Sequence, residues 1–153
     1  MAYRVVALGQ QIADEVRTTM RSPGYGHPAH VEMARGTGPC RLCLRPFRVN
    51  EEERVLFTYN PFPDEADLPS PGPIFVHKAD CARFEGPGFP PELLGLPLTL
   101  EGYDDRGAAV ARVRADDPDA SVRAVLARPG VAYAHVRNSE AGCFITRVES
   151  VAG

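Results

Sequence analysis

Apolar residues recur along the first half of the chain in short runs that alternate between strand and helix spacing. Residues 3–8 (YRVVAL) predict a strand, and apolar side chains at Ile12, Val16 and Met20 share one helix face, so we expect a helix that ends near Ser22. A short strand is predicted at residues 30–34. Residues 54–59 and 72–77 predict two paired strands, joined by a loop rich in proline over residues 60–71.

The second half of the chain predicts two hairpins with a helix between them. Residues 98–103 and 108–114 flank a turn that contains Gly107, and residues 131–137 and 142–148 flank a second turn. Between the hairpins, Asp117 and Pro118 are typical of a helix start, and the pair at residues 129–130 (Pro-Gly) stops the helix. About seven strands and two helices predict an α+β fold with a mainly antiparallel sheet.

Composition places the chain among ordinary folded proteins. Its 153 residues fit a single domain over residues 1–153, and 29 of them (14 Gly and 15 Pro) indicate many loops. The 17 basic and 20 acidic residues give a net charge of −3 without a basic cluster, so a nucleic-acid partner is not expected. No apolar run approaches the ~20 residues of a membrane span, and the first residues do not resemble a signal peptide. We therefore expect a cytoplasmic protein without a membrane partner.

The four cysteines are the strongest chemical signal in the sequence. In the cytosol, thiols stay reduced, which favours metal binding, catalysis or packing over disulfides. Cys40 and Cys43 form a C-x2-C turn, and His77 and Cys81 lie four positions apart at the end of a predicted strand. We expect Cys81 in the first turn of a short helix over residues 78–84.

Three thiolates and one imidazole match a closed tetrahedral zinc site, in a turn, hairpin and helix order that resembles a treble-clef zinc finger. Buried free cysteines or a redox-active Cys40/Cys43 pair are the alternatives, and a further one has Cys143 in place of His77.

The turn of the last hairpin is a second candidate site. Strand alternation places His135 and Arg137 on one face, near Asn138 and Cys143 in the turn region. Arg137 would bind a small anionic molecule, His135 would transfer a proton, and Cys143 would act as nucleophile. One alternative is that these residues only form an ordinary turn and strand. Another is that the edge of this hairpin mediates formation of a homodimer.

Five stretches resemble an uncharacterised bacterial family, domain of unknown function 1203. The resemblance covers the chain from about Cys40 to its end and implies no reaction, substrate or partner. The stretches are GPCRLCL (residues 38–44), VLFTYNPF (55–62), GPIFVHKADC (72–81), LEGYDDRG (100–107) and VAYAHVRNSEAGCFITRV (131–148).

The sequence therefore supports two hypotheses of different classes. The leading one is a zinc-stabilised cytosolic binding or accessory protein. The alternative is a small-molecule enzyme that uses the face of the last hairpin, and the sequence does not decide whether any reaction is catalysed.

Overall fold

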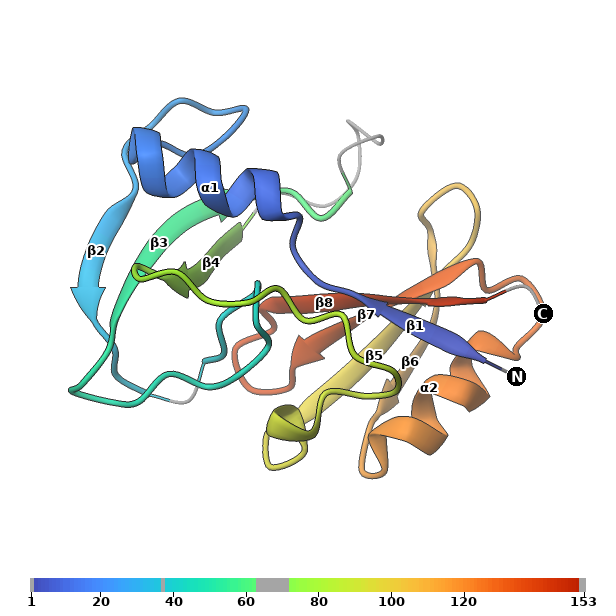
Figure 1. The fold of residues 1–153 in the computed structure, drawn as a ribbon. Coiled ribbons are helices and arrows are strands. Elements are labelled where there is room, and N and C mark those ends of the chain that lie inside the picture. The colour runs from blue at the N-terminus through green and yellow to red at the C-terminus, as the bar shows by residue number, and fades with distance from the viewer. Residues whose placement is uncertain (1, 37, 63–71, 152–153) are drawn as a thin grey trace.

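The computed structural model describes residues 2–36, 38–62 and 72–151, and it folds into two antiparallel sheets with one α-helix against each (Figure 1). The larger sheet has five strands in the order β1-β8-β7-β5-β6: β1 (Tyr3–Val6), β8 (Phe144–Ser150), β7 (Tyr133–Asn138), β5 (Leu98–Tyr103) and β6 (Ala109–Arg114). The smaller sheet has three, in the order β2-β3-β4: β2 (His30–Met33), β3 (Glu53–Tyr59) and β4 (Gly72–His77).

Helix α2 (Pro118–Leu126) packs on the five-stranded sheet. It begins where predicted, because the Asp117 side chain accepts a hydrogen bond from the amide of Ala120 at 3.3 Å. Val122 and Val125 are fully buried against the strands. The approach is close at Gly102 of β5, where a Cβ atom would lie 3.1 Å from Val125 Cγ1, so glycine permits this packing.

Helix α1 (Gln10–Thr19) packs on the three-stranded sheet. Its Ala13 and Val16 are fully buried in a second apolar cluster, together with Val55 of β3 and Val76 of β4. The helix ends one residue before Met20, which adopts a left-handed conformation with φ of 54° and closes the last turn. This end lies close to the predicted one at Ser22. No helix in the described ranges is both long and apolar enough to cross a membrane.

The turn that carries Cys40 and Cys43 lies between the two apolar clusters. Leu42 packs into the cluster of the small sheet, and Leu44 packs into the cluster of the large sheet, both with no exposed surface. Just before Leu42, the amide of Arg41 donates to Phe75 O of β4, and the Arg41 carbonyl accepts from the amide of Leu8 after β1. The turn is thus held by buried contacts on both sides.

Most of the predicted elements are present, and the structure differs from the prediction in three respects. The strands divide into two sheets, and β8 and β7 are interior strands of the larger one. A homodimer through the edge of the last hairpin stays a prediction. A single-turn 3-10 helix (Pro91–Leu93) was not predicted, and residues 78–84 form no helix. Of the predicted loop over residues 60–71, residues 63–71 lie outside the described ranges.

Candidate metal centre

The first two candidate ligands lie in a tight turn whose ends are bridged. Pro39 and Pro46 form an isolated β-bridge, and the Cys40 amide donates to Arg45 O at 2.9 Å. The chain reverses through Leu44, which has φ of 57°, and the Leu44 amide bonds to Cys40 O at 2.9 Å. This closed turn directs both sulfur atoms to one side, as a C-x2-C metal turn requires.

The other two candidate ligands come from the end of β4 and the segment after it. His77 is the last residue of β4, and its amide donates to the Cys40 sulfur at 3.4 Å. Cys81 follows in an irregular segment instead of the predicted helix, because Arg17 of α1 donates to His77 O at 2.9 Å and to Ala79 O at 3.0 Å. Those carbonyls are therefore bonded by a side chain and not by helical amides.

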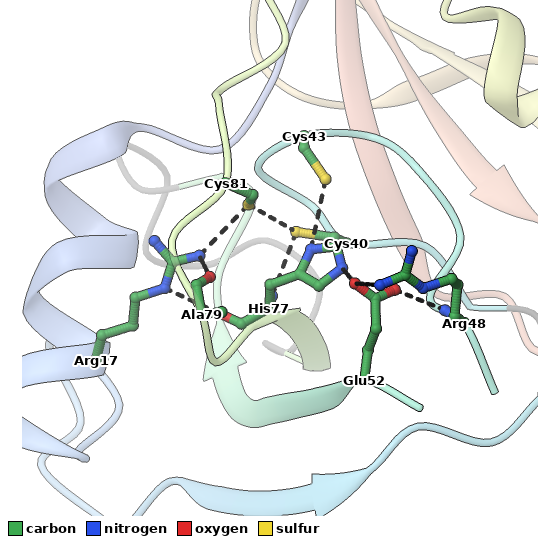
Figure 2. Close-up of polar contacts among 8 residues, drawn as sticks. All are labelled: Arg17, Cys40, Cys43, Arg48, Glu52, His77, Ala79 and Cys81. Atoms are coloured by element: carbon green, nitrogen blue, oxygen red, sulfur yellow. Dashed lines mark hydrogen bonds and ion pairs between the residues drawn. The ribbon is translucent and has the colours of Figure 1, made fainter. Parts of the chain in front are cut away.

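Two separations between the four ligand atoms match those of a tetrahedral site (Figure 2). Bond lengths of about 2.3 Å for Zn–S and about 2.0 Å for Zn–N imply S···S separations of about 3.8 Å and S···N separations of about 3.5 Å around one ion. The Cys40 and Cys81 sulfurs lie 3.8 Å apart, and Cys43 Sγ lies 3.5 Å from His77 Nδ1. All four atoms lie within 4.8 Å of one another, so Cys40, Cys43, His77 and Cys81 are brought together as predicted.

Glu52 orients the imidazole of His77 toward the sulfurs. Its Oε2 lies 3.0 Å from His77 Nε2, on the opposite side of the ring from Nδ1 (Figure 2). A carboxylate at Nε2 favours the tautomer with hydrogen on Nε2, which leaves the Nδ1 lone pair free to bind a metal. The ring of Phe47 lies 4.6 Å from the imidazole and fixes its plane. This arrangement is typical of histidine ligands in metal sites.

Positive charge surrounds the sulfur atoms. Arg17 Nη2 lies 3.4 Å from the Cys81 sulfur, and the side chain of Arg45 interacts with the Cys43 sulfur. Hydrogen bonds with Cys40 and Cys81, together with His77, lower the pKa of Cys43, while contacts with the sulfurs of Cys43 and Cys81 raise the pKa of His77 to about 10. Three thiolates and one Zn²⁺ sum to −1, so these guanidinium groups complement the charge of a loaded site.

The residues of the predicted hairpin site separate into different environments. The imidazole of His135 is fully buried among aromatic rings, and its Nδ1 lies 3.3 Å from Arg137 Nη2. Its Nε2 has no hydrogen-bond partner among the described residues. Burial lowers the pKa of His135 to about 3, so this ring is neutral at physiological pH. Asn138 Oδ1 accepts from the amides of Glu140 and Ala141, which is a turn contact.

Arg137 and Cys143 both line a cavity of about 620 Å³ between the two sheets. Tyr59, Phe62 and Phe144 form its aromatic walls, and Arg137 Nε lies 3.1 Å from Glu101 Oε1. The structure brings Arg137 and Cys143 to one cavity, while His135 lies beneath its walls and Asn138 does not line it. The ligand-binding roles of these four residues remain predictions. Cys143 does not belong to the metal-ligand group, in which His77 stands with the three other cysteines.

Fold and site together define an α+β protein of two antiparallel sheets with a Cys3His candidate metal centre. The chain belongs to the family described as "Protein of unknown function (DUF1203)", whose model matches residues 37–150, and this confirms the resemblance. No curated protein and no solved structure matches the chain. The family description brings no biochemical role, so the function must be argued from the site itself.

Sequence reasoning missed Arg17 and Glu52, which contact the ligands from outside the set. Glu52 precedes β3 and reaches His77 only because Arg54 pairs with His77 across the sheet. Arg17 reaches the site because α1 packs on that sheet. One signal was available: Arg17 follows the buried Val16 on the predicted helix, so it had to lie near the edge of the buried face.

Proposed function

We propose that this protein is a zinc-stabilised cytosolic binding or accessory protein, in which Cys40, Cys43, His77 and Cys81 hold one structural zinc ion. The observation that carries this proposal is the match between the ligand separations and a tetrahedron, at 3.8 Å for sulfur to sulfur and 3.5 Å for sulfur to nitrogen. The alternative of cysteines buried only for packing does not account for an imidazole oriented by a carboxylate at the same point.

The donor set favours zinc and a structural role. Thiolates select soft or borderline ions, and a tetrahedral site of three sulfurs and one nitrogen is typical of zinc. Four protein ligands leave no open position for water or substrate, so the ion supplies stability and no chemistry. It would join the buried turn at residues 40–43 to the end of β4 and to Cys81, which lies in a segment without regular structure.

Metal analysis with two matched variants tests this proposal. We expect one zinc ion per chain after purification in mild reducing buffer, and a lower urea midpoint after treatment with a chelator, because binding free energy adds to folding free energy. Cys81→Ser should lose the ion, whereas Cys143→Ser, which changes a cysteine outside the cluster, should keep it. A wild-type protein that is purified without zinc, and whose urea midpoint does not respond to chelator, would contradict the proposal.

A small-molecule enzyme is the second candidate function, and one observation favours it. The cavity of about 620 Å³ has the size of a metabolite site, and it places the partly exposed Cys143 beside the ion pair of Arg137 and Glu101. Such an enzyme would use the Cys143 thiolate as nucleophile. Its test is the rate of Cys143 alkylation as a function of pH: activation near neutral pH supports it, and the profile of a simple thiol contradicts a cysteine mechanism.

A further inference from the structure

Arg41 carries a buried positive charge that pairs with no carboxylate of the described residues. The residue is 3% exposed; its Nε donates to Phe144 O at 2.8 Å, and its Nη1 donates to Pro39 O. Within the described ranges no carboxylate oxygen lies within 4.0 Å of its guanidinium nitrogens. By contrast, the buried Arg54 pairs with Glu32 at 3.0 Å, and Arg137 pairs with Glu101 at 3.1 Å.

A buried charge without a carboxylate partner is costly. Moving an ion out of water carries an effective penalty of several kcal/mol, and a hydrogen bond to a carbonyl offsets part of this cost without neutralising the charge. A guanidinium stays charged at neutral pH even when it is buried, so Arg41 keeps its positive charge in the folded protein. A counter-ion near Arg41 would therefore stabilise the fold.

A cavity lies directly beside this charge. Its volume is about 430 Å³, and Arg41, Arg54, Cys143 and the ring of Phe75 are among the lining residues. Three arginines and one glutamate line the cavity, so its lining has a net charge of +2. Glu32, which lies outside the lining, pairs with Arg35 and Arg54 and neutralises part of this charge. Arg41 Nη2 makes no hydrogen bond to the described residues, which leaves one edge of the guanidinium available.

The same cavity has apolar walls. Arg54 stacks over the Phe75 ring at 3.7 Å from its centre, and Leu56 and two prolines also line the space. These walls suit the organic part of a ligand whose charged group contacts Arg41. The cavity differs from the cleft that contains Arg137, where Glu101 already supplies the counter-charge, and Cys143 lines both.

We propose that the cavity beside Arg41 binds a small organic anion, whose carboxylate or phosphate oxygens pair with the Arg41 guanidinium. Guanidinium groups bind carboxylates and phosphates alike through charge-assisted hydrogen bonds, so Arg41 would recognise either group in the same way. The site does not depend on the identity of the metal.

The test uses sodium phosphate and sodium acetate as probes, with sodium chloride at equal ionic strength as reference. Binding to the folded protein should raise the Tm by about 5 °C at a probe concentration 20 times its Kd. A response to phosphate alone assigns a phosphate-bearing ligand, and a response to acetate alone assigns a carboxylate. Equal Tm values in phosphate, acetate and chloride would overturn the proposal.

Three variants make the result specific. Arg41→Met should lose the response, and Arg106→Met, which changes an arginine in the exposed turn before β6, should keep it. Cys143→Asp places a carboxylate in the cavity while it retains Arg41, so it should have a higher Tm in chloride and a weaker response to the probes. This variant decides the matter if Arg41→Met does not fold. Zinc content is measured for each variant, so that a response lost through the metal centre is recognised. A response that persists in both Arg41→Met and Cys143→Asp overturns the proposal.

Discussion

Glu52→Gln isolates the contribution of the carboxylate that orients His77. The substitution removes the charge 3.0 Å from His77 Nε2. It also leaves one acceptor oxygen where the carboxylate has two, one facing His77 Nε2 and one accepting from the Arg48 amide at 2.7 Å. Loss of such an outer partner weakens metal binding by about 10- to 100-fold, or about 1.4 to 2.7 kcal/mol. We expect the upper end of this range, because the one amide oxygen cannot accept from both the Arg48 amide and His77 Nε2.

Competition with a zinc chelator of known affinity measures this change. Co²⁺ substitution adds an independent readout, because the visible absorption of tetrahedral cobalt depends on its ligands and should be retained if His77 stays bound. Glu53→Gln is the matched control, since this neighbouring carboxylate is half exposed and pairs with Lys78 at 3.7 Å instead of with a ligand. The reasoning is refuted if the two variants bind zinc equally tightly, because the effect of Glu52 would then be general surface charge.

Three further predictions concern the five-stranded sheet and helix α2. Gly102→Ala should destabilise the protein by about 1 to 3 kcal/mol through overpacking against α2, while Gly95→Ala, with open space around its Cβ, should be nearly neutral in urea denaturation. Asp117→Ala removes the cap of α2 and should cost about 1 kcal/mol, whereas Asp116→Ala, one residue earlier, should change the Tm little. The pKa of His135 is about 3 in the folded protein and ordinary in the unfolded chain, so unfolding takes up a proton between about pH 3 and 6.5 and stability falls as pH drops through this window, by up to about 1.4 kcal/mol per pH unit. His135→Phe should therefore flatten the pH dependence of the urea midpoint over this window, and an unchanged slope would show that this ring does not titrate on unfolding.

The candidate ligands could be predicted because their chemistry is local in the sequence. A C-x2-C turn and a histidine four residues before a cysteine retain their meaning wherever the surrounding elements pack. The residues that contact the ligands could not be found in this way. Glu52 reaches His77 because of the register between β3 and β4, and the residues between these strands do not reveal that register in the sequence. The position of Arg17 depends on how α1 packs on the sheet.

The same distinction applies to the fold. Alternation and turn residues predicted nearly all the strands and the three pairs of neighbouring strands, β3 with β4, β5 with β6 and β7 with β8. They carry no information on how strands far apart in the sequence pair, such as β1 with β8, so the division into two sheets was missed. The helix over residues 78–84 was wrong because Arg17, far away in the sequence, bonds the carbonyls that its first turn would use. The prediction of a single domain rests on length alone and stays a prediction.

The order of elements along the chain gives the two sheets different histories during synthesis. All strands of the small sheet and all four candidate ligands are present once residue 81 has left the ribosome. The large sheet cannot be completed until β8 has been synthesised, because β1 pairs directly with β8 (Figure 1). A zinc ion captured early would hold the nascent small sheet in place while the rest of the chain is made.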